Sequence, residues 1–303
     1  MSNEHTVILI AFALFIPAMV ISGCLGDDDG SEGLDLVIVS ILPQKNMIEM
    51  IAGEDVNVIV MIPEGQSPHD HSPTPGQLID VARADMYFKI GSGLEFEELH
   101  MDTLIEQNRG MKIIDLSEGI ELKTFDEHHG FDEHRGHSSI DTHIWLSTAN
   151  LAIMAENVRD ALIKEDPDGN YSQGYQDYMD LLNPKIEEIT TILKPYRDRE
   201  FLTYHPSWGY FADDLDLIQL AIEEDGKAPG PQGVAGMIEQ AKDHNITVIF
   251  VEPQFDTSSA EEIADAIGGR VVMVDPLAED MESNLLEVAR AMVDGFNCCE
   301  VDP

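Results

Sequence analysis

The sequence predicts an α/β fold with two lobes, each containing a mostly parallel β-sheet flanked by helices. Three observations predict it. Eight short apolar runs, rich in β-branched residues, are spread along the chain from residue 34 onwards. Amphipathic helical stretches separate these runs, which is typical of parallel sheets covered on both faces. A long helical stretch, near residues 170–195, divides the runs into two sets.

The first set of runs defines an N-terminal lobe. Its predicted strands are LDLVIVSI, VNVIVMI, MYFKIG and MKIIDL, with helical stretches at 44–53 and 76–84. A later helix begins after Ser147, whose hydroxyl can accept a hydrogen bond from a first-turn N–H group. We therefore assign residues 35–168 to the N-terminal lobe, with a His-rich loop at 125–139.

The second set of runs defines a C-terminal lobe of similar plan. A connecting helix at 169–197 precedes it, and Pro184 is a possible bend in that helix. The C-terminal lobe is assigned to residues 198–303. Its predicted strands are EFLTYH, DLIQLAI, ITVIFVEP and RVVMVD, and its predicted helices lie near 232–243, 258–267 and 280–296. The chain has no short-period repeat.

The N-terminus predicts export from the cytoplasm. Val7 to Ile21 is uncharged and has the length of a signal-peptide apolar region. The following ISGC resembles a lipobox, which would make residues 1–24 a signal peptide and Cys24 the lipid-modified residue, although no Lys or Arg precedes the run. The alternative is a simple anchor helix. Residues 25–34 predict a flexible acidic tether, so the lobes are expected at the outer face of the cell membrane.

The charge balance excludes one class of partner. Lys and Arg number 17 against 58 Asp and Glu, a formal net charge of −41. No stretch is basic enough to neutralise phosphates, so nucleic acid is excluded as a partner. An acidic surface attracts cations and also suits very salty surroundings. The remaining cysteines, Cys298 and Cys299, are adjacent and imply no disulfide framework.

Polar residues follow four of the predicted strands or lie in polar loops near them. These residues include His69, Asp141 with His143, His205 and Asp275. Ligands of parallel α/β sheets bind beyond the carboxyl ends of strands, so such side chains can converge in a cleft between the lobes. Three imidazoles and one carboxylate suit a tetrahedral Zn²⁺ ion, with Mn²⁺ or Fe²⁺ less favoured. A lone histidine after a strand is more often a hydrogen-bonded structural residue.

Five longer motifs resemble those of the metal-specific substrate-binding lipoproteins of ABC importers, the ZnuA/TroA group. They are PEGQSPHDHSPTP, DTHIWLSTAN, TYHPSWGYFADDLDL, VIFVEPQFDTSSAEEIADAIGG and VVMVDPLAED, and they run in order over nearly the whole chain from residue 36. The resemblance implies a rigid backbone helix between the lobes and a metal between them. It also implies that the metal ligands are His69, His143, His205 and Asp275.

The resemblance also separates the roles of the clustered histidines. Position 205 is commonly a carboxylate in manganese-type members, so His205 favours zinc. A His-rich loop occurs in zinc-type members, which implies weak extra zinc sites at His128, His129, His134 and His137. Asp141 and Glu252 are candidates to orient ligating imidazoles through the second ring nitrogen. Either could instead be an ordinary hydrogen-bond partner at a strand end.

The function predicted from these features is capture of Zn²⁺ outside the cytoplasm and delivery to an ABC permease by a monomeric, non-enzymatic protein. Four protein ligands leave no open position on zinc for an activated water. HExxH spacing, a phosphate-binding Gly-rich loop and a nucleophile elbow are absent from the sequence. The alternatives are manganese or iron import, a surface adhesin, and a secreted zinc hydrolase in which Asp275 is the base.

Overall fold

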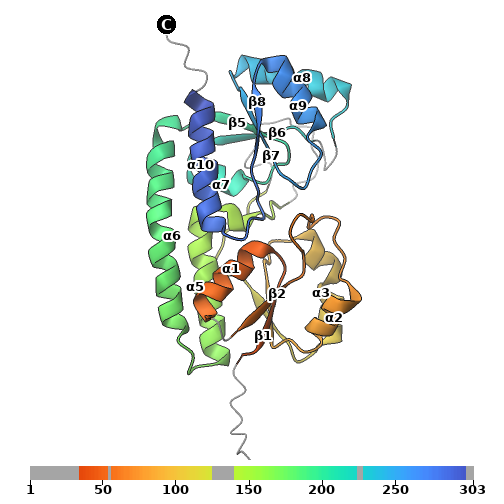
Figure 1. Ribbon diagram of the computed structural model, residues 1–303, viewed down its shortest axis with the longest axis vertical. Helices are drawn as coiled ribbons and strands as arrows, with labels where there is room; N and C mark the ends of the chain where they lie inside the picture. Colours follow the sequence, from red (N-terminus) through yellow and green to blue (C-terminus); the bar gives the residue numbers. More distant parts are fainter. Residues whose placement is uncertain (1–33, 54–55, 125–139, 224–227, 298–303) are drawn as a thin grey trace, which may run out of the picture. The chain divides into compact units, whose positions relative to one another are not determined.

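Two parallel β-sheets form the framework of the protein (Figure 1). The computed structural model describes residues 34–53, 56–124, 140–223 and 228–297. The first sheet has the order β2-β1-β3-β4 and the second the order β6-β5-β7-β8, with every strand pair parallel. The strands are β1 (Leu36–Val39), β2 (Asn57–Val60), β3 (Met86–Lys89), β4 (Lys112–Asp115), β5 (Glu200–Thr203), β6 (Ile218–Ala221), β7 (Val248–Val251) and β8 (Arg270–Met273).

The predicted fold class is confirmed, and each predicted strand contains one observed strand. The helices are α1 (Leu42–Ala52), α2 (Pro75–Val81), α3 (Glu95–Gln107), α5 (Thr148–Glu165), α6 (Tyr171–Leu193), α7 (Gly209–Asp214), α8 (Pro231–Asp243), α9 (Ser258–Ile267) and α10 (Met281–Asn297), with short 3₁₀ turns η1 (Ile144–Leu146) and η2 (Lys194–Tyr196). Helices α3 and α7 were not predicted. The long helix α6 passes through Pro184 and leads into the second lobe (Figure 1).

The lobes share a hydrophobic core on the side of the long helices. One cluster of buried residues includes Val37 in β1, Tyr178 in α6, Phe201 in β5 and Met292 in α10. Helices α6 and α10 lie side by side in Figure 1 and pack on each other. A second cluster covers the other face of the C-terminal sheet beneath α8 and α9. Because apolar burial is the main favourable contribution to folding, the shared cluster holds the two sheets together.

The N-terminus of helix α5 is capped by Ser147 and is also bound by Asp214 of the other lobe. Ser147 accepts a hydrogen bond from the backbone N–H of Asn150 at 3.0 Å, which confirms the predicted N-cap. Asp214 in α7 accepts bonds from the hydroxyl groups of Ser147 and Thr148, both at 2.8 Å, and from the Ala149 N–H at 3.2 Å. A carboxylate at a helix N-terminus also interacts favourably with the helix dipole. The contact therefore fixes α5 against the C-terminal lobe.

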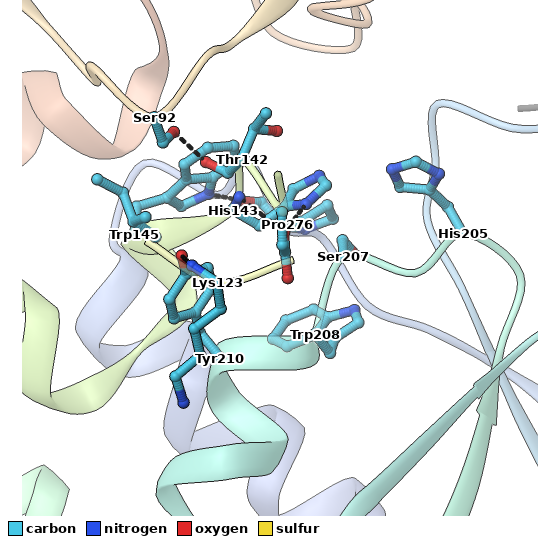
Figure 2. A network of polar contacts seen from close by, with 12 residues as sticks. Ser92, Lys123, Thr142, His143, Trp145, His205, Ser207, Trp208, Tyr210 and Pro276 are labelled. Atoms are coloured by element: carbon cyan, nitrogen blue, oxygen red, sulfur yellow. Dashed lines mark hydrogen bonds and ion pairs between the residues drawn. The ribbon is translucent and has the colours of Figure 1, made fainter. Parts of the chain in front are cut away.

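Further polar contacts join the lobes near their facing ends. The indole N–H of Trp145 donates to the carbonyl oxygen of Pro276 at 2.7 Å, and the backbone N–H of Lys123 donates to the Tyr210 hydroxyl at 2.9 Å (Figure 2). Lys45 in α1 forms an ion pair with Glu279 at 2.6 Å. These bonds involve both backbone and side chains, so they restrict sliding of one lobe over the other. No helix of the described segments is long and apolar enough to cross a membrane.

Helices α1 and α6 approach closely at a glycine. A Cβ atom at Gly174 would lie 2.2 Å from the backbone oxygen of Ile51, the penultimate residue of α1. Backbone cannot move aside as a flexible side chain can, so only glycine permits this helix spacing. At Gly236, in α8, a Cβ atom would meet nothing within 4 Å.

We predict opposite effects of Ala substitution at these two glycines. Gly174→Ala should lower the free energy of unfolding by about 1–3 kcal/mol, because α1 and α6 must separate. Gly236→Ala should raise it by about 0.4–1 kcal/mol, because Ala restricts the unfolded chain and favours helix. Urea denaturation of both variants measures the difference. Equal stabilisation by both substitutions would show that the α1–α6 contact is loose.

Candidate metal centre

Three histidines converge where the two lobes face each other. One ring nitrogen from each of His69, His143 and His205 lies within 4.8 Å of those of the other two. The ring centroids of His69 and His143 each lie 5.2 Å from that of His205. His69 lies between β2 and α2, His143 precedes η1, and His205 follows β5. Figure 2 shows His143 and His205 on segments of different elements. The convergence of polar residues at strand ends is the arrangement expected for a ligand site in parallel sheets.

The three rings differ in their access to solvent. The side chains of His143 and His205 are 7% and 10% exposed, whereas that of His69 is 31% exposed. The rings line a cavity of about 20 Å³, which also contacts Trp145, Gln254 and Phe255. That volume is enough for one water-sized group. In the described part of the chain, Nε2 of His205 is buried without a hydrogen-bond partner. An unpaired buried acceptor is costly, so this nitrogen is suited to a ligand.

Each of the three imidazoles is paired with a carboxylate at its other nitrogen. Nδ1 of His69 lies 3.0 Å from Glu95, the first residue of α3. Nδ1 of His143 lies 2.8 Å from Asp141, and Nδ1 of His205 lies 2.8 Å from Glu223. An ionised carboxylate only accepts hydrogen bonds, so Nδ1 carries the proton and Nε2 keeps its lone pair. Carboxylate–imidazole pairing of this kind orients histidines that bind metals.

Local charges shift the pKa values of these groups in different directions. The hydrogen bond that the His69 ring donates to Glu95 raises the pKa of His69 more than burial lowers it. Burial lowers the pKa of His205 and outweighs the opposite effect of Glu223, while His143 and His69 lower that pKa further. Burial therefore favours the neutral form of His205, which is the form that binds metal. Burial alone would raise the pKa of Glu95, but its bond to His69 lowers it overall.

Strand order explains which carboxylate meets the ring of His205. Strand β5 lies between β6 and β7, so His205 is flanked by Glu223 after β6 and Glu252 after β7. Glu252 accepts bonds from the backbone N–H of His205 at 3.4 Å and from the Ser207 hydroxyl at 3.0 Å. Burial raises the pKa of Glu252 to about 8. Glu223 thus contacts the ring of His205 and Glu252 contacts its backbone, so an orienting role of Glu252 toward the imidazole stays a prediction.

The ligand role predicted for Asp275 stays a prediction. Asp275 follows β8, and its carboxylate does not belong to the group formed by the three ring nitrogens. Oδ1 of Asp275 accepts bonds from the side-chain amide of Gln254 and from the backbone N–H of Leu277, both at 2.9 Å. These two bonds fix the carboxylate in its own turn. Asp141, by contrast, contacts the His143 ring as expected.

Several residues around the rings were not identified from the sequence. Glu223 follows a predicted strand as His205 does, so the same strand-end rule applied to the sixth strand would have found it. Glu95 could not be found in this way, because it begins the unpredicted helix α3. Phe255 stacks on His205 with a centroid distance of 5.0 Å, and Trp145 lies 5.2 Å from His143. Other predicted sites lie outside the described residues, namely Cys24, His128, His129, His134 and His137.

Comparisons with known proteins agree with this geometry. Residues 37–299 match the family described as zinc-uptake complex component A, periplasmic. The chain is 26% identical to the high-affinity zinc uptake system protein ZnuA of Bacillus subtilis, over 89% of this chain and 87% of that protein. It is also 26% identical to the manganese-binding lipoprotein MntA of Halalkalibacterium halodurans, over 86% of each.

A solved structure gives the same result for the fold. The crystal structure of a ZnuA deletion mutant with zinc bound has a TM-score of 0.79 and 35% identity, over 89% of this chain and 100% of that chain. The family match covers most of the sequence and includes all three clustered histidines. The chain therefore belongs to the ZnuA family of periplasmic binding proteins, which are not enzymes and which capture divalent metal for ABC uptake systems.

Proposed function

We propose that the captured metal is Zn²⁺, bound by Nε2 of His69, His143 and His205. The observation that carries the proposal is the meeting of three ring nitrogens within 4.8 Å. Zn–N bonds are about 2.0–2.1 Å, so two nitrogens on one tetrahedral ion are about 3.4 Å apart. Small rotations of the rings are enough to reach that spacing. The carboxylates on Nδ1 make each imidazole a stronger ligand.

The nature of the ligand atoms favours zinc over manganese. Three neutral nitrogens suit Zn²⁺, whereas Mn²⁺ prefers carboxylate and carbonyl oxygens. The similar identity to a manganese-binding relative keeps manganese as the alternative cargo. Adhesion has no support from the relatives reported above, which carry names of metal-uptake proteins. A hydrolase is not consistent with membership of a family of binding proteins.

The remaining parts of the proposal concern delivery to the membrane. We infer that residues 1–24 are a signal peptide and that a lipid on Cys24 holds the protein at the outer face of the membrane. Residues 25–34 are the tether to the lobes. The two lobes are residues 35–168 and 198–303, and the helix at 169–197 connects them. Zinc is then passed to an ABC permease. His128, His129, His134 and His137 would bind further zinc weakly near the cleft.

Calorimetric titration with Zn²⁺ and Mn²⁺ tests the proposed cargo. The protein should bind one Zn²⁺ more tightly than Mn²⁺, and His205→Ala should lose this tight site because only two imidazoles remain. Deletion of residues 126–138 should remove only weaker sites. His244→Ala is the matched control, since His244 pairs with Glu200 away from the cluster. Tight zinc binding by His205→Ala, or tighter binding of Mn²⁺, would contradict the proposal.

The zinc affinities of two Glu→Gln variants distinguish Glu223, which contacts the His205 ring, from Glu252, which contacts His205 only at its backbone. Glu223→Gln should weaken zinc binding by roughly 10- to 100-fold, because the His205 ring loses its carboxylate partner. Glu252→Gln should leave the affinity nearly unchanged at pH 7, because its raised pKa already keeps that group protonated. Competition with a chromogenic chelator measures both affinities. If the two variants lose zinc affinity equally, the contact between Glu223 and the His205 ring does not strengthen zinc binding in particular.

The raised pKa of His69 predicts how capture depends on acidity. A proton competes with zinc for this imidazole. As the pH is lowered, zinc affinity should therefore start to fall before pH 6.5 is reached, because the pKa of His69 is raised. Glu95→Gln removes the group that raises it and should move this loss to lower pH. The same variant should bind zinc roughly 10-fold less tightly at pH 8. Unshifted pH profiles of the variant and the parent protein would argue against the His69–Glu95 pair.

A further inference from the structure

The three imidazoles leave one position of a tetrahedral ion to be filled. Gln254, which follows β7, lines the same cavity as His69, His143 and His205. Its side-chain amide can offer a neutral oxygen to a cation. Asp275, the fourth ligand expected from the sequence, is not in the group of converging ligand atoms. The contacts of Gln254 and Asp275 therefore indicate which of these two side chains provides the fourth ligand.

The orientation of the Gln254 amide is fixed by its neighbour. The Gln254 amide nitrogen, Nε2, donates to Oδ1 of Asp275 at 2.9 Å. Because an ionised carboxylate has no proton to donate, the amide must present its nitrogen to Asp275 and direct Oε1 elsewhere. That oxygen is buried and has no hydrogen-bond partner among the described residues. Gln254 therefore lines the metal cavity and carries a free acceptor.

Two residues that line this one small cavity each carry an unpaired acceptor. Nε2 of His205 and Oε1 of Gln254 are both buried and without partners in the described segments. Leaving either unpaired is unfavourable, because a buried acceptor loses the hydrogen bonds that it would make with water. Two lone pairs cannot satisfy each other, but a cation between them satisfies both. The cavity of about 20 Å³ is the size for a single small ion or water molecule.

Asp275 is engaged in a different task. Its Oδ1 accepts from the Leu277 backbone N–H as well as from Gln254. If this carboxylate turned toward the imidazoles, both bonds would be lost. If it stays, it polarises the amide and strengthens the negative partial charge on Oε1. Carboxylates that act through a ligand in this way are common around metals.

We propose that Gln254 supplies the fourth ligand through its amide oxygen and that Asp275 positions this amide. The inference rests on the proposed function, since it names a further residue of the same site. The directly bound groups would then all be neutral, three nitrogens and one oxygen. Four carboxylates, those of Glu95, Asp141, Glu223 and Asp275, would each lie one residue further from the ion and stabilise its positive charge.

Cobalt-loaded protein tests the fourth position, because Co²⁺ reports its coordination in the visible spectrum. With Gln254 bound, the spectrum should not change between about pH 6.5 and 9 or on addition of thiocyanate. Gln254→Leu should open the position to water, whose pKa on such a metal is about 7–9. Its spectrum should therefore titrate and respond to thiocyanate, and zinc affinity should fall roughly 10-fold or more.

Further variants separate the possible outcomes. Gln254→Asn keeps an amide but shortens its reach, so it should open the site as Gln254→Leu does without adding an apolar group. Gln173→Leu is the matched control, since Gln173 contacts Asp177 on the exposed side of α6 and does not line the cavity. Asp275→Asn should keep the closed spectrum and lose affinity. Thermal unfolding of the metal-free variants checks that each is folded.

Two results would overturn the inference while leaving the proposed function intact. One is a thiocyanate response of the unmodified protein, which would show a water in the fourth position. The other is an open spectrum for Asp275→Asn with a closed one for Gln254→Leu, which would make Asp275 the ligand. By contrast, failure of the unmodified protein to bind one equivalent of Co²⁺ or Zn²⁺ would contradict the proposed function itself.

Discussion

The pairing of each buried or half-buried imidazole with a carboxylate is the constraint on which the site depends. Without a partner, a histidine ring can rotate and exchange its proton between two nitrogens. Glu95, Asp141 and Glu223 each fix one ring through Nδ1. The three Nε2 atoms then keep their lone pairs, and the site is arranged before metal arrives. Preorganisation of this kind lowers the entropy cost of binding.

The fold sets how far the two halves of the site can move. His69 and His143 belong to the part before α6 and His205 to the part after it, so an ion between them bridges the lobes. The shared hydrophobic cluster and the capping of α5 by Asp214 oppose a wide hinge motion. His69 is the most exposed of the three rings and lies on a loop between β2 and α2. On the proposed function, we expect entry and release of metal to depend more on this loop than on separation of the lobes.

The sequence predicted the sheets better than the ligand environment. Strands are visible as apolar runs because both faces of a parallel sheet are buried, as in the fully buried LVIV of β1 and VIFV of β7. Helix α3 was missed because its 13 residues bury few side chains, and Glu95 was missed with it. Strand ends pointed to His205 and Asp275 alike. Only the order of neighbouring strands and the hydrogen bonds in the turns distinguish Glu223, Glu252 and Gln254, and neither is written in local spacing.

The strongly acidic composition and the neutral ring nitrogens act over different distances. A net charge of −41 raises the local concentration of every cation near the protein, but this attraction is screened within about 10 Å in 0.1 M salt. It cannot tell Zn²⁺ from Mg²⁺ or Ca²⁺, because it depends on charge alone. Choice among cations must arise where bonds of about 2 Å form, and imidazole nitrogens bind Mg²⁺ and Ca²⁺ poorly. An acidic exterior around a site of neutral nitrogen ligands thus separates the gathering of cations from their selection.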